Sequence, residues 1–277
     1  MWKRWMWWVC GLMAVMLFMN YATESIPVRF SSSISADSEF SVLCYNVKCS
    51  DVGYRENQID IANMIIKESP DVVYLCEFNR SVSKGLDSLM INQGGYKSIY
   101  KKGANCIFYS KYDLDSIIGI NTGTSCGKKA LNNLVYAKIP QGLITFIGCH
   151  FSSSGAGIVA SYRGRKEEAD SIYKVCMKEA RPLIVLGDMN DISGSYPINR
   201  IKEAGLKDAW WEGGRGYGAT FQAGLLKLRI DHILYDYEGL ELVEVKVIDN
   251  DLSDHNALMA RFKIRNNYIK NNINKLK

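Results

Sequence analysis

Leu183-Ile-Val-Leu-Gly-Asp-Met-Asn190 is the stretch from which the fold of this chain can be inferred. Its first four residues are apolar and have the length of a buried β-strand. Gly187 and Asp188 end that strand, and Asn190 follows two residues later. Polar side chains at the ends of buried strands meet along one edge of a sheet, where α/β proteins gather ligands and catalytic groups. The stretch therefore predicts a buried sheet with a polar edge.

The same arrangement recurs along the chain. Apolar runs of strand length end at Asn46, Glu77 and His150, and two later runs begin at or beside Asp231 and Asp254. The chain contains three histidines, and each of them lies in one of these segments. Taken singly, each residue is more often a turn or capping residue. As a set, carboxylates and amides with one or two imidazoles suit Mg²⁺, Mn²⁺ or Ca²⁺ better than Zn²⁺ and predict a metal-dependent site.

Helical and strand-like segments alternate from residue 40 onward. Apolar residues recur at helical spacing in 57–68 and in 162–179, and a shorter helix is expected at 198–204. The expected strands are 40–46, 71–77, 105–110, 134–139, 143–151, 183–186, 230–235, 242–248 and 257–264. This alternation predicts α/β layering in one domain, because no long linker divides it.

Seven segments in this order resemble the endonuclease/exonuclease/phosphatase superfamily, the group related to deoxyribonuclease I and exonuclease III. The segments are Leu43-Cys-Tyr-Asn46-Val, Tyr74-Leu-Cys-Glu77, Ile147-Gly-Cys-His150-Phe, Val185-Leu-Gly-Asp188-Met-Asn190, Thr220-Phe, Arg229-Ile-Asp231-His232-Ile-Leu and Ser253-Asp254-His255. His232 stands where the family often has an aromatic residue, but this change removes no donor that the mechanism needs. The resemblance implies an α/β fold, namely a four-layered sandwich of two mixed β-sheets flanked by helices.

The resemblance also implies roles for the residues of these segments. It implies metal ligation by Asn46, Glu77 and Asp254, and catalysis by His150, Asp188, Asn190, Asp231 and His255. The candidate substrate contacts are Arg163, Arg165 and Thr220, and the two arginines could equally be solvated surface charges. The expected cofactor is Mg²⁺, with Mn²⁺ or Ca²⁺ as alternatives.

Phosphodiester hydrolysis requires the parts that this set offers. The reaction needs a positioned water, neutralised phosphate oxygens and a stabilised leaving oxygen, and a divalent ion with flanking donors supplies most of this electrostatically. The resemblance implies that Asp188 orients or deprotonates the water, and that His150 and Asn190 contact the phosphate. A carboxylate that holds an imidazole fixes its tautomer and raises its basicity, which is the value of pairing Asp231 with His255.

The N-terminus carries a membrane-targeting pattern. Lys3 and Arg4 precede nineteen uncharged residues, Trp5 to Thr23, which approach the length of a membrane span and also fit a signal peptide. We expect a membrane anchor or signal peptide at 1–25, a Ser-rich linker at 26–39, the catalytic domain at 40–265 and a basic Asn/Lys-rich tail at 266–277. Either form places the catalytic domain outside the cytoplasm, where it is membrane-anchored or secreted.

Net charge does not identify the substrate. The formal charge is +5, but seven of the basic residues lie at the two ends of the chain. Without these seven residues, the net charge of the rest of the chain is close to −2. No basic patch for nucleic acid can therefore be inferred from composition. No protein partner is indicated and a monomer is expected. Cys106 and Cys126 are the pair proposed for a disulfide.

Three functions remain open on the sequence. The first is a phosphodiesterase or nuclease, and the second is a phospholipid or sphingolipid phosphodiesterase or a phosphomonoesterase. The third is a catalytically silent binding module, which is disfavoured because every expected donor is present. A lipid enzyme would be expected to expose an apolar hairpin, for which Trp210-Trp211 is the only candidate, and such a Trp pair is more often core packing.

Overall fold

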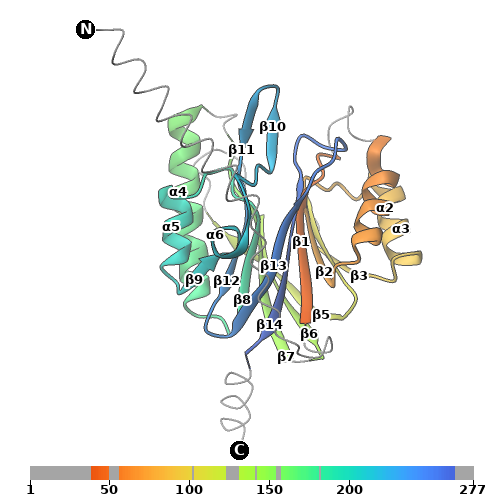
Figure 1. Ribbon diagram of the computed structural model, residues 1–277, viewed down its shortest axis with the longest axis horizontal. Coiled ribbons are helices and arrows are strands. Elements are labelled where there is room, and N and C mark those ends of the chain that lie inside the picture. The colour runs from red at the N-terminus through yellow and green to blue at the C-terminus, as the bar shows by residue number, and fades with distance from the viewer. Residues whose placement is uncertain are drawn as a thin grey trace, which may run out of the picture.

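The computed structural model places two six-stranded β-sheets face to face, with helices on the outer face of each sheet (Figure 1). It describes residues 39–49, 56–101, 103–122, 131–140, 142–153, 157–180 and 182–265. The N-terminal segment 1–25, the linker up to residue 38, the tail 266–277 and Cys126 of the proposed disulfide lie outside the described residues. Within the described part of the chain, no helix combines the length and the apolar composition that crossing a membrane requires.

Both sheets are mixed. The first has the order β13-β14-β1-β2-β4-β3, and its strands are β1 (Glu39–Asn46), β2 (Val72–Cys76), β3 (Lys97–Tyr100), β4 (Cys106–Ser110), β13 (Leu240–Ile248) and β14 (Ala257–Ile264). The second has the order β5-β6-β7-β8-β12-β9, and its strands are β5 (Asp113–Asn121), β6 (Leu131–Ile139), β7 (Gly142–His150), β8 (Leu183–Asp188), β9 (Leu206–Asp208) and β12 (Asp231–Asp236). The pairs β1–β2 and β7–β8 are parallel, and the other pairs of the two sheets are antiparallel.

Helices form the two outer layers. The helices α2 (Gln58–Glu68) and α3 (Lys84–Asn92) cover the first sheet, and α4 (Ile158–Cys176) and α5 (Tyr196–Lys202) cover the second (Figure 1). The short α6 (Ala209–Gly213) is followed by a separate hairpin of β10 (Phe221–Ala223) and β11 (Leu226–Leu228). The predicted arrangement of two mixed sheets flanked by helices is confirmed.

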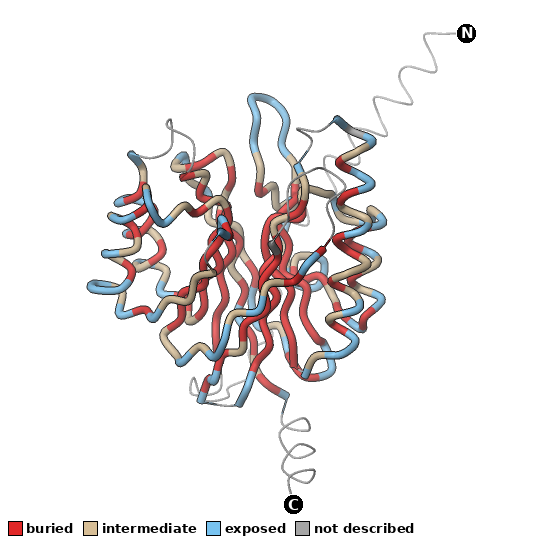
Figure 2. Tube along the Cα trace, turned by 180° about the vertical axis from the view of Figure 1, so that it is seen from behind, coloured by how far each residue is buried: buried red, intermediate tan, exposed pale blue. Residues whose placement is uncertain are grey.

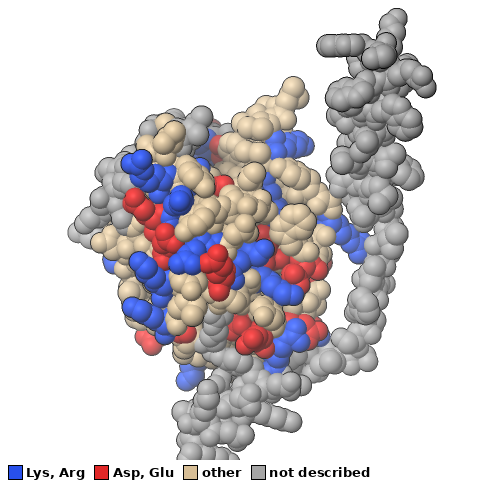
Figure 3. Space-filling model, turned by 90° about the vertical axis from the view of Figure 1, so that its left-hand side faces the viewer, with Lys and Arg blue, Asp and Glu red and all other residues tan. Residues whose placement is uncertain are grey.

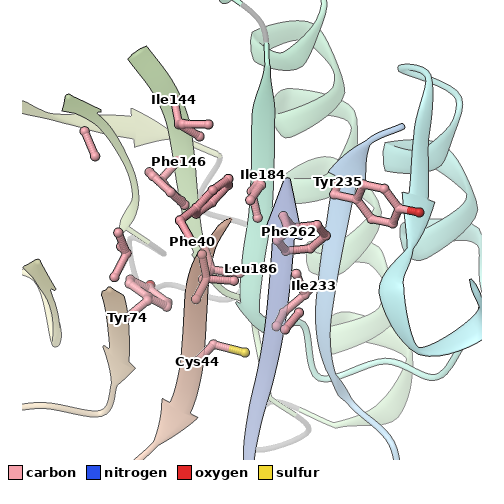
Figure 4. Packing of buried hydrophobic residues seen from close by; sticks show 14 of the residues in the cluster. Phe40, Cys44, Tyr74, Ile144, Phe146, Ile184, Leu186, Ile233, Tyr235 and Phe262 are labelled. Carbon is pink, nitrogen blue, oxygen red and sulfur yellow. The ribbon is translucent and has the colours of Figure 1, made fainter. Parts of the chain in front are cut away.

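The two faces of β1 show why the chain forms these layers. Val42 and Cys44 lie in the core between the sheets, whereas Leu43 and Tyr45 pack with residues of α2 and α3. Side chains alternate between the two faces of a strand, so a strand that is apolar on both faces must be covered on both sides. The strand β8 behaves in the same way between the inter-sheet core and α4. Figure 4 shows side chains from both sheets meeting in the inter-sheet core.

Two glycines allow the sheets to approach closely beneath the strand ends. Tyr74 is fully buried in the inter-sheet core. A Cβ atom added at Gly148 would lie 2.2 Å from the Tyr74 ring, and one added at Gly187 would lie 2.8 Å from the same ring. Gly187 also has a φ of +131°, which side chains rarely tolerate. Packing therefore requires glycine at both positions: Gly148 near the end of β7 and Gly187 near the end of β8.

Some elements were not predicted from the sequence: α3, β3, β5, β9, α6 and the β10–β11 hairpin. In β5 a bulge between Asp115 and Ile117 shifts the register, and Ser116 there has a φ of +36°. A bulge adds one residue to a strand and so breaks the period of two by which strands are recognised. Trp210 packs against the inter-sheet core, as is more usual for such a Trp pair, whereas Trp211 is 69% exposed. Both lie in helix α6, so this candidate for the apolar hairpin of a lipid enzyme is not a hairpin.

Candidate active site

The sheet register brings the predicted site residues to one edge of the sandwich, the upper edge in Figure 1. In the first sheet Asn46 is paired with the last residue of β2, which directly precedes Glu77. In the second sheet His150 is paired with Asp188, and Asp231 is paired with Asp188 from the other side. Residues that are far apart in the sequence therefore share one rim.

Asn46 connects the two sheets at this rim. It is buried, and its Nδ2 donates to Oε1 of Glu77 at 3.1 Å and to Oδ2 of Asp188 at 3.0 Å. Its Oδ1 accepts a hydrogen bond from the backbone N–H of Lys48 at 3.2 Å. Glu77 has a φ of +51° and Asn190 a φ of +49°, a conformation that costs about 1–3 kcal/mol in residues other than glycine. Such strain clusters at functional sites, where the surrounding fold maintains it.

His150 and Asn190 lie beside these carboxylates. Nε2 of His150 is 3.7 Å from Oε1 of Glu77 and 3.9 Å from Oδ2 of Asp188, which is too long for direct hydrogen bonds. The backbone N–H of Asn190 donates to Oδ1 of Asp188 at 2.9 Å, and its Nδ2 donates to the backbone oxygen of Phe151 at 3.0 Å. Both side chains are half-buried, so their outer atoms are open to a substrate.

Asp231, His255 and Asp188 form a line across the rim. Nδ1 of His255 lies 2.8 Å from Oδ2 of Asp231, and Nε2 of His255 lies 3.8 Å from Oδ2 of Asp188. Because the Asp231 carboxylate can only accept, Nδ1 carries the proton and the imidazole orientation is fixed. The backbone N–H groups of Ile230 and Asp231 donate to Oγ1 of Thr220 at 3.2 and 3.0 Å, which holds the carboxylate in place.

Two pKa shifts follow from this geometry. Burial by itself lowers the pKa of His255, but the charge of Asp231 and the hydrogen bond to it outweigh burial and raise this pKa to about 9. Burial raises the pKa of the Asp188 carboxyl, and the charge of Asp231 raises it further. Two carboxylates in one buried site repel each other, and a cation between them relieves that repulsion.

The donor set fits a divalent cation. Ligand atoms of Asp188, Asp231 and His255 all lie within 4.8 Å of one another. Oδ1 of Asp231 is buried and has no hydrogen-bond partner. Carboxylate oxygens with an imidazole suit hard or borderline divalent ions, Mg²⁺ and Mn²⁺ among them. The predicted ligands flank this tight group: Asn46, Glu77 and Asp254.

Lys48 belongs to the site although it was not predicted from the sequence. Its Nζ lies 2.5 Å from Oδ2 of Asp254, and both side chains are partly buried. The hydroxyl of Ser253 donates to the backbone oxygen of Asn46 at 2.8 Å, which fastens the Ser-Asp-His segment to the end of β1. Lys48 follows Asn46 by two positions, and this nearness to a site residue is the signal in the sequence that could have identified it.

A buried network behind the rim supports two of its loops. Arg229 is buried and donates to Oδ2 of Asp208 at 3.0 Å and to the hydroxyl of Ser193. His232 is fully buried, with Nδ1 3.1 Å from Oδ2 of Asp208 and Nε2 2.9 Å from the backbone oxygen of Asp191. Burial raises the pKa of Asp208, but His232 and Arg229 together lower it to about 2. His232 is therefore part of the scaffold and does not lie on the rim.

The three predicted substrate contacts lie in different environments. Arg165 is paired with Asp191 at 2.8 Å and donates to the backbone oxygen of Ser152 at 3.1 Å. Arg163 is exposed on α4, beside a surface hollow of about 420 Å³. Thr220 is buried and holds the backbone of the Asp231 segment. The face over α4 and α5 carries Lys, Arg, Asp and Glu side chains in a mixture of both signs (Figure 3).

Comparisons with known proteins agree with this fold. The model of the endonuclease/exonuclease/phosphatase family matches residues 43–255. A Bacteroides vulgatus endonuclease/exonuclease/phosphatase structure has a TM-score of 0.68 at 17% identity, over 82% of this chain and 99% of that chain. D. rerio TDP2 complexed with a single-strand DNA product has a TM-score of 0.67 at 16% identity, over 82% and 100%. ANGEL2, a 2′,3′-cyclic phosphatase, has a TM-score of 0.65 at 16% identity, over 82% and 96%. No curated protein sequence matches this chain.

Proposed function

The chain belongs to the endonuclease/exonuclease/phosphatase family, and from this premise we propose that it is a divalent-metal-dependent phosphodiesterase that acts outside the cytoplasm. The observation that carries the proposal is the line from Asp231 through His255 to Asp188, at distances of 2.8 and 3.8 Å. This line lies at the rim where Asn46 also contacts Asp188 at 3.0 Å. Phosphoester hydrolysis is the chemistry common to the family.

Each side chain has a task that its position supports. Asp188 orients the attacking water and accepts its proton. Nε2 of His255 contacts the phosphate, while Asp231 holds the other ring nitrogen at 2.8 Å. His150 and Asn190 neutralise charge on the phosphate oxygens from the half-buried side of the rim. Preoriented groups of this kind stabilise the charge that develops in the transition state.

A different set of side chains is proposed to hold the metal ion. Glu77 and Asp254, with Asn46, are the proposed ligands, and Mg²⁺ is the proposed ion, with Mn²⁺ or Ca²⁺ as alternatives. A bound divalent ion supplies Lewis-acid activation and neutralises phosphate charge. Burial raises the pKa of Asp188 and the charge of Asp231 raises it further, and this uncompensated negative charge supports the proposal of a cation at this edge.

The substrate class of first choice is a nucleic-acid end. This choice rests on the solved neighbours, one of which holds a single-strand DNA product and another an adenosine-2′,3′-vanadate. The second candidate is a phospholipid or sphingolipid ester. The exposed apolar β10–β11 hairpin, in which Leu225 is fully exposed, is the observation that favours it. A silent binding module is disfavoured, because the rim retains the acid, imidazole and amide donors that hydrolysis requires.

Hydrolysis assays of the full chain in detergent micelles test the proposal. The substrates are bis(p-nitrophenyl) phosphate, single-stranded DNA, RNA and sphingomyelin, with Mg²⁺, Mn²⁺ or Ca²⁺ and with EDTA as the metal-free arm. Asp188→Asn is expected to lower turnover by at least about 10²-fold. Asp113→Asn, an exposed carboxylate at the start of β5, is the matched control and is expected to leave turnover unchanged. Equal turnover by wild type and Asp188→Asn on every substrate would refute the proposal.

The location outside the cytoplasm is tested separately. Protease added to intact cells is expected to degrade the domain that follows residue 39, while a cytoplasmic control protein stays intact. Protection of the domain until the cells are lysed would contradict the proposed location and would leave the proposed chemistry untouched.

A further inference from the structure

We propose that the β10–β11 hairpin docks onto the surface of a phospholipid bilayer and holds the catalytic edge close to it. The hairpin joins Phe221–Ala223 to Leu226–Leu228 through Gly224 and Leu225. It projects from the sandwich at the edge where the candidate active site lies (Figure 1), and its tip is coloured as exposed in Figure 2. The inference goes beyond the proposed function, because it concerns the surface to which the protein binds. It applies whichever phosphodiester is the substrate.

The tip of the hairpin is apolar. Leu225 is fully exposed and Leu226 is 53% exposed. Ala223 and Lys227 beside them are also exposed. Scattered exposed leucines are common, but two adjacent leucines at the tip of a projecting hairpin form a surface that is stabilised by burial in an apolar medium. Lys227 adds a positive charge that suits an anionic headgroup.

The base of the hairpin is bonded to catalytic residues. The backbone N–H of Gln222 donates to the backbone oxygen of Asp254 at 2.9 Å. Phe221 forms an isolated bridge with His255, and the centroids of their rings are 5.0 Å apart. Strands of three residues place the tip about 10 Å from this base. A tip that inserts into the headgroup region therefore sets the catalytic edge at a fixed, short distance from the lipid surface.

The part of the chain that precedes β1 explains why a bilayer is the chosen partner. The uncharged segment from Trp5 to Thr23 is expected to be a membrane anchor or a signal peptide, and the inference takes the anchored form. The thirteen residues from 26 to 38, which precede β1, can reach about 43 Å when extended. β1 is eight residues long, so Glu39 lies only about 26 Å from the catalytic edge. The linker is therefore long enough for the domain to turn that edge towards the membrane.

A tethered domain needs only a weak contact to dock. The anchor keeps the domain at a high effective concentration next to the bilayer, which converts docking into an intramolecular step. Each leucine that is fully buried in lipid strengthens the partition by about tenfold or more. Two leucines are too few for stable binding from free solution, but they suffice for a domain that is already held at the surface.

A fluorescent probe on the full chain tests this inference. An environment-sensitive dye is attached to Leu225→Cys, in a background with Cys10→Ser and Cys126→Ser, because the other six cysteines are buried. The matched control is Leu143→Cys at the start of β7, which is 48% exposed and lies at the opposite end of that strand from His150. Both chains are reconstituted in vesicles of phosphatidylcholine and phosphatidylglycerol.

The expected result is a blue shift of the probe at position 225, with quenching by spin-labelled lipid, and no change at position 143. Leu226→Ser in the labelled chain is expected to shift the docking equilibrium by about tenfold towards the undocked state. Equal water-like emission at both positions, or equal quenching at both, would overturn the inference. So would a probe at 225 that responds to single-stranded DNA in detergent micelles and not to vesicles. Hydrolysis of bis(p-nitrophenyl) phosphate by the same vesicles is scored separately, so that failure of the proposed chemistry can be distinguished from failure of docking.

Discussion

Glu168 makes the stability of this protein depend on pH in a predictable direction. The side chain is 2% exposed on α4 and accepts hydrogen bonds from the backbone N–H and the hydroxyl of Ser152 at 2.9 and 3.0 Å. Burial raises its pKa from 4.5 to about 7, and the two hydrogen bonds only partly offset this rise. The folded state therefore binds this proton more tightly than the unfolded state does.

The sign and the size of the effect follow from proton linkage. Because the pKa is raised on folding, the contribution of Glu168 to stability is fully present below about pH 4.5 and is lost as the pH rises through about 7. One pKa unit corresponds to about 1.4 kcal/mol, so the loss between pH 5 and pH 8 is about 2–3 kcal/mol. Glu168→Gln keeps the shape and an acceptor oxygen but cannot ionise. Its stability relative to wild type is therefore expected to rise by that amount over the same interval.

Urea unfolding, followed by tryptophan fluorescence at pH 5, 6, 7 and 8, measures this difference. The other titrating groups are common to both proteins and cancel in the comparison. Asp60→Asn, an exposed carboxylate on α2, is the matched control and should stay parallel to wild type. A difference between Glu168→Gln and wild type that is constant from pH 5 to pH 8 would refute the reasoning.

Three further predictions concern the packing and the rim. Gly148→Ala places a Cβ 2.2 Å from the Tyr74 ring and is expected to lower the free energy of unfolding in urea by about 1–3 kcal/mol. In a Tyr74→Leu background the same substitution should cost much less, and simple additivity of the two substitutions would contradict the packing explanation. Thr220→Val leaves two buried backbone N–H groups without their acceptor and is expected to lower the free energy of unfolding by about 1–3 kcal/mol, whereas Thr220→Ser should be nearly as stable as wild type. Similar losses of stability in both variants would show that the hydroxyl is not the stabilising group. Lys48→Met removes the positive charge next to Asp254, which competes with a metal ion for that carboxylate. It is therefore expected to lower the dissociation constant of Mn²⁺, measured by calorimetry, by about two- to fivefold. An unchanged dissociation constant would argue against Asp254 as a ligand.

The candidate site shows where reasoning from sequence succeeds. The residues at strand ends could be identified because buried apolar runs are visible in the sequence, and the first polar residue after each run is easy to find. Asn46 at the end of β1 and Asp188 at the end of β8 are examples, and they lie 3.0 Å apart. Their roles in metal binding and catalysis remain predictions, which the variants above are designed to test.

Other features of the site could not be read from local patterns. Lys48 reaches Asp254 only because the segment before β14 folds back over the end of β1. His232 looked equivalent to the other two histidines, but the alternation of side chains in β12 turns it away from the rim towards Asp208. The exposed apolar hairpin does not lie at Trp210-Trp211, the candidate pair in the sequence, but at Leu225, after Gly224 with a φ of +59°. A Gly-X pair between two short apolar runs is a known hairpin signal and could have indicated it.

The sequence by itself therefore determined the class of fold, the strands and helices with regular periods, and the polar residues at strand ends that gather at the candidate site. These properties are local, because burial on both faces of β1 or on one face of α2 is encoded in the spacing of apolar residues. The stretch from Leu183 to Asn190 contains a complete strand and its polar end. Only the tertiary structure decided which carboxylates become neighbours, which histidine is scaffold and which apolar tip is left in solvent. The pairing of β8 with β12 joins residues that are more than forty positions apart, and no local pattern encodes such a register.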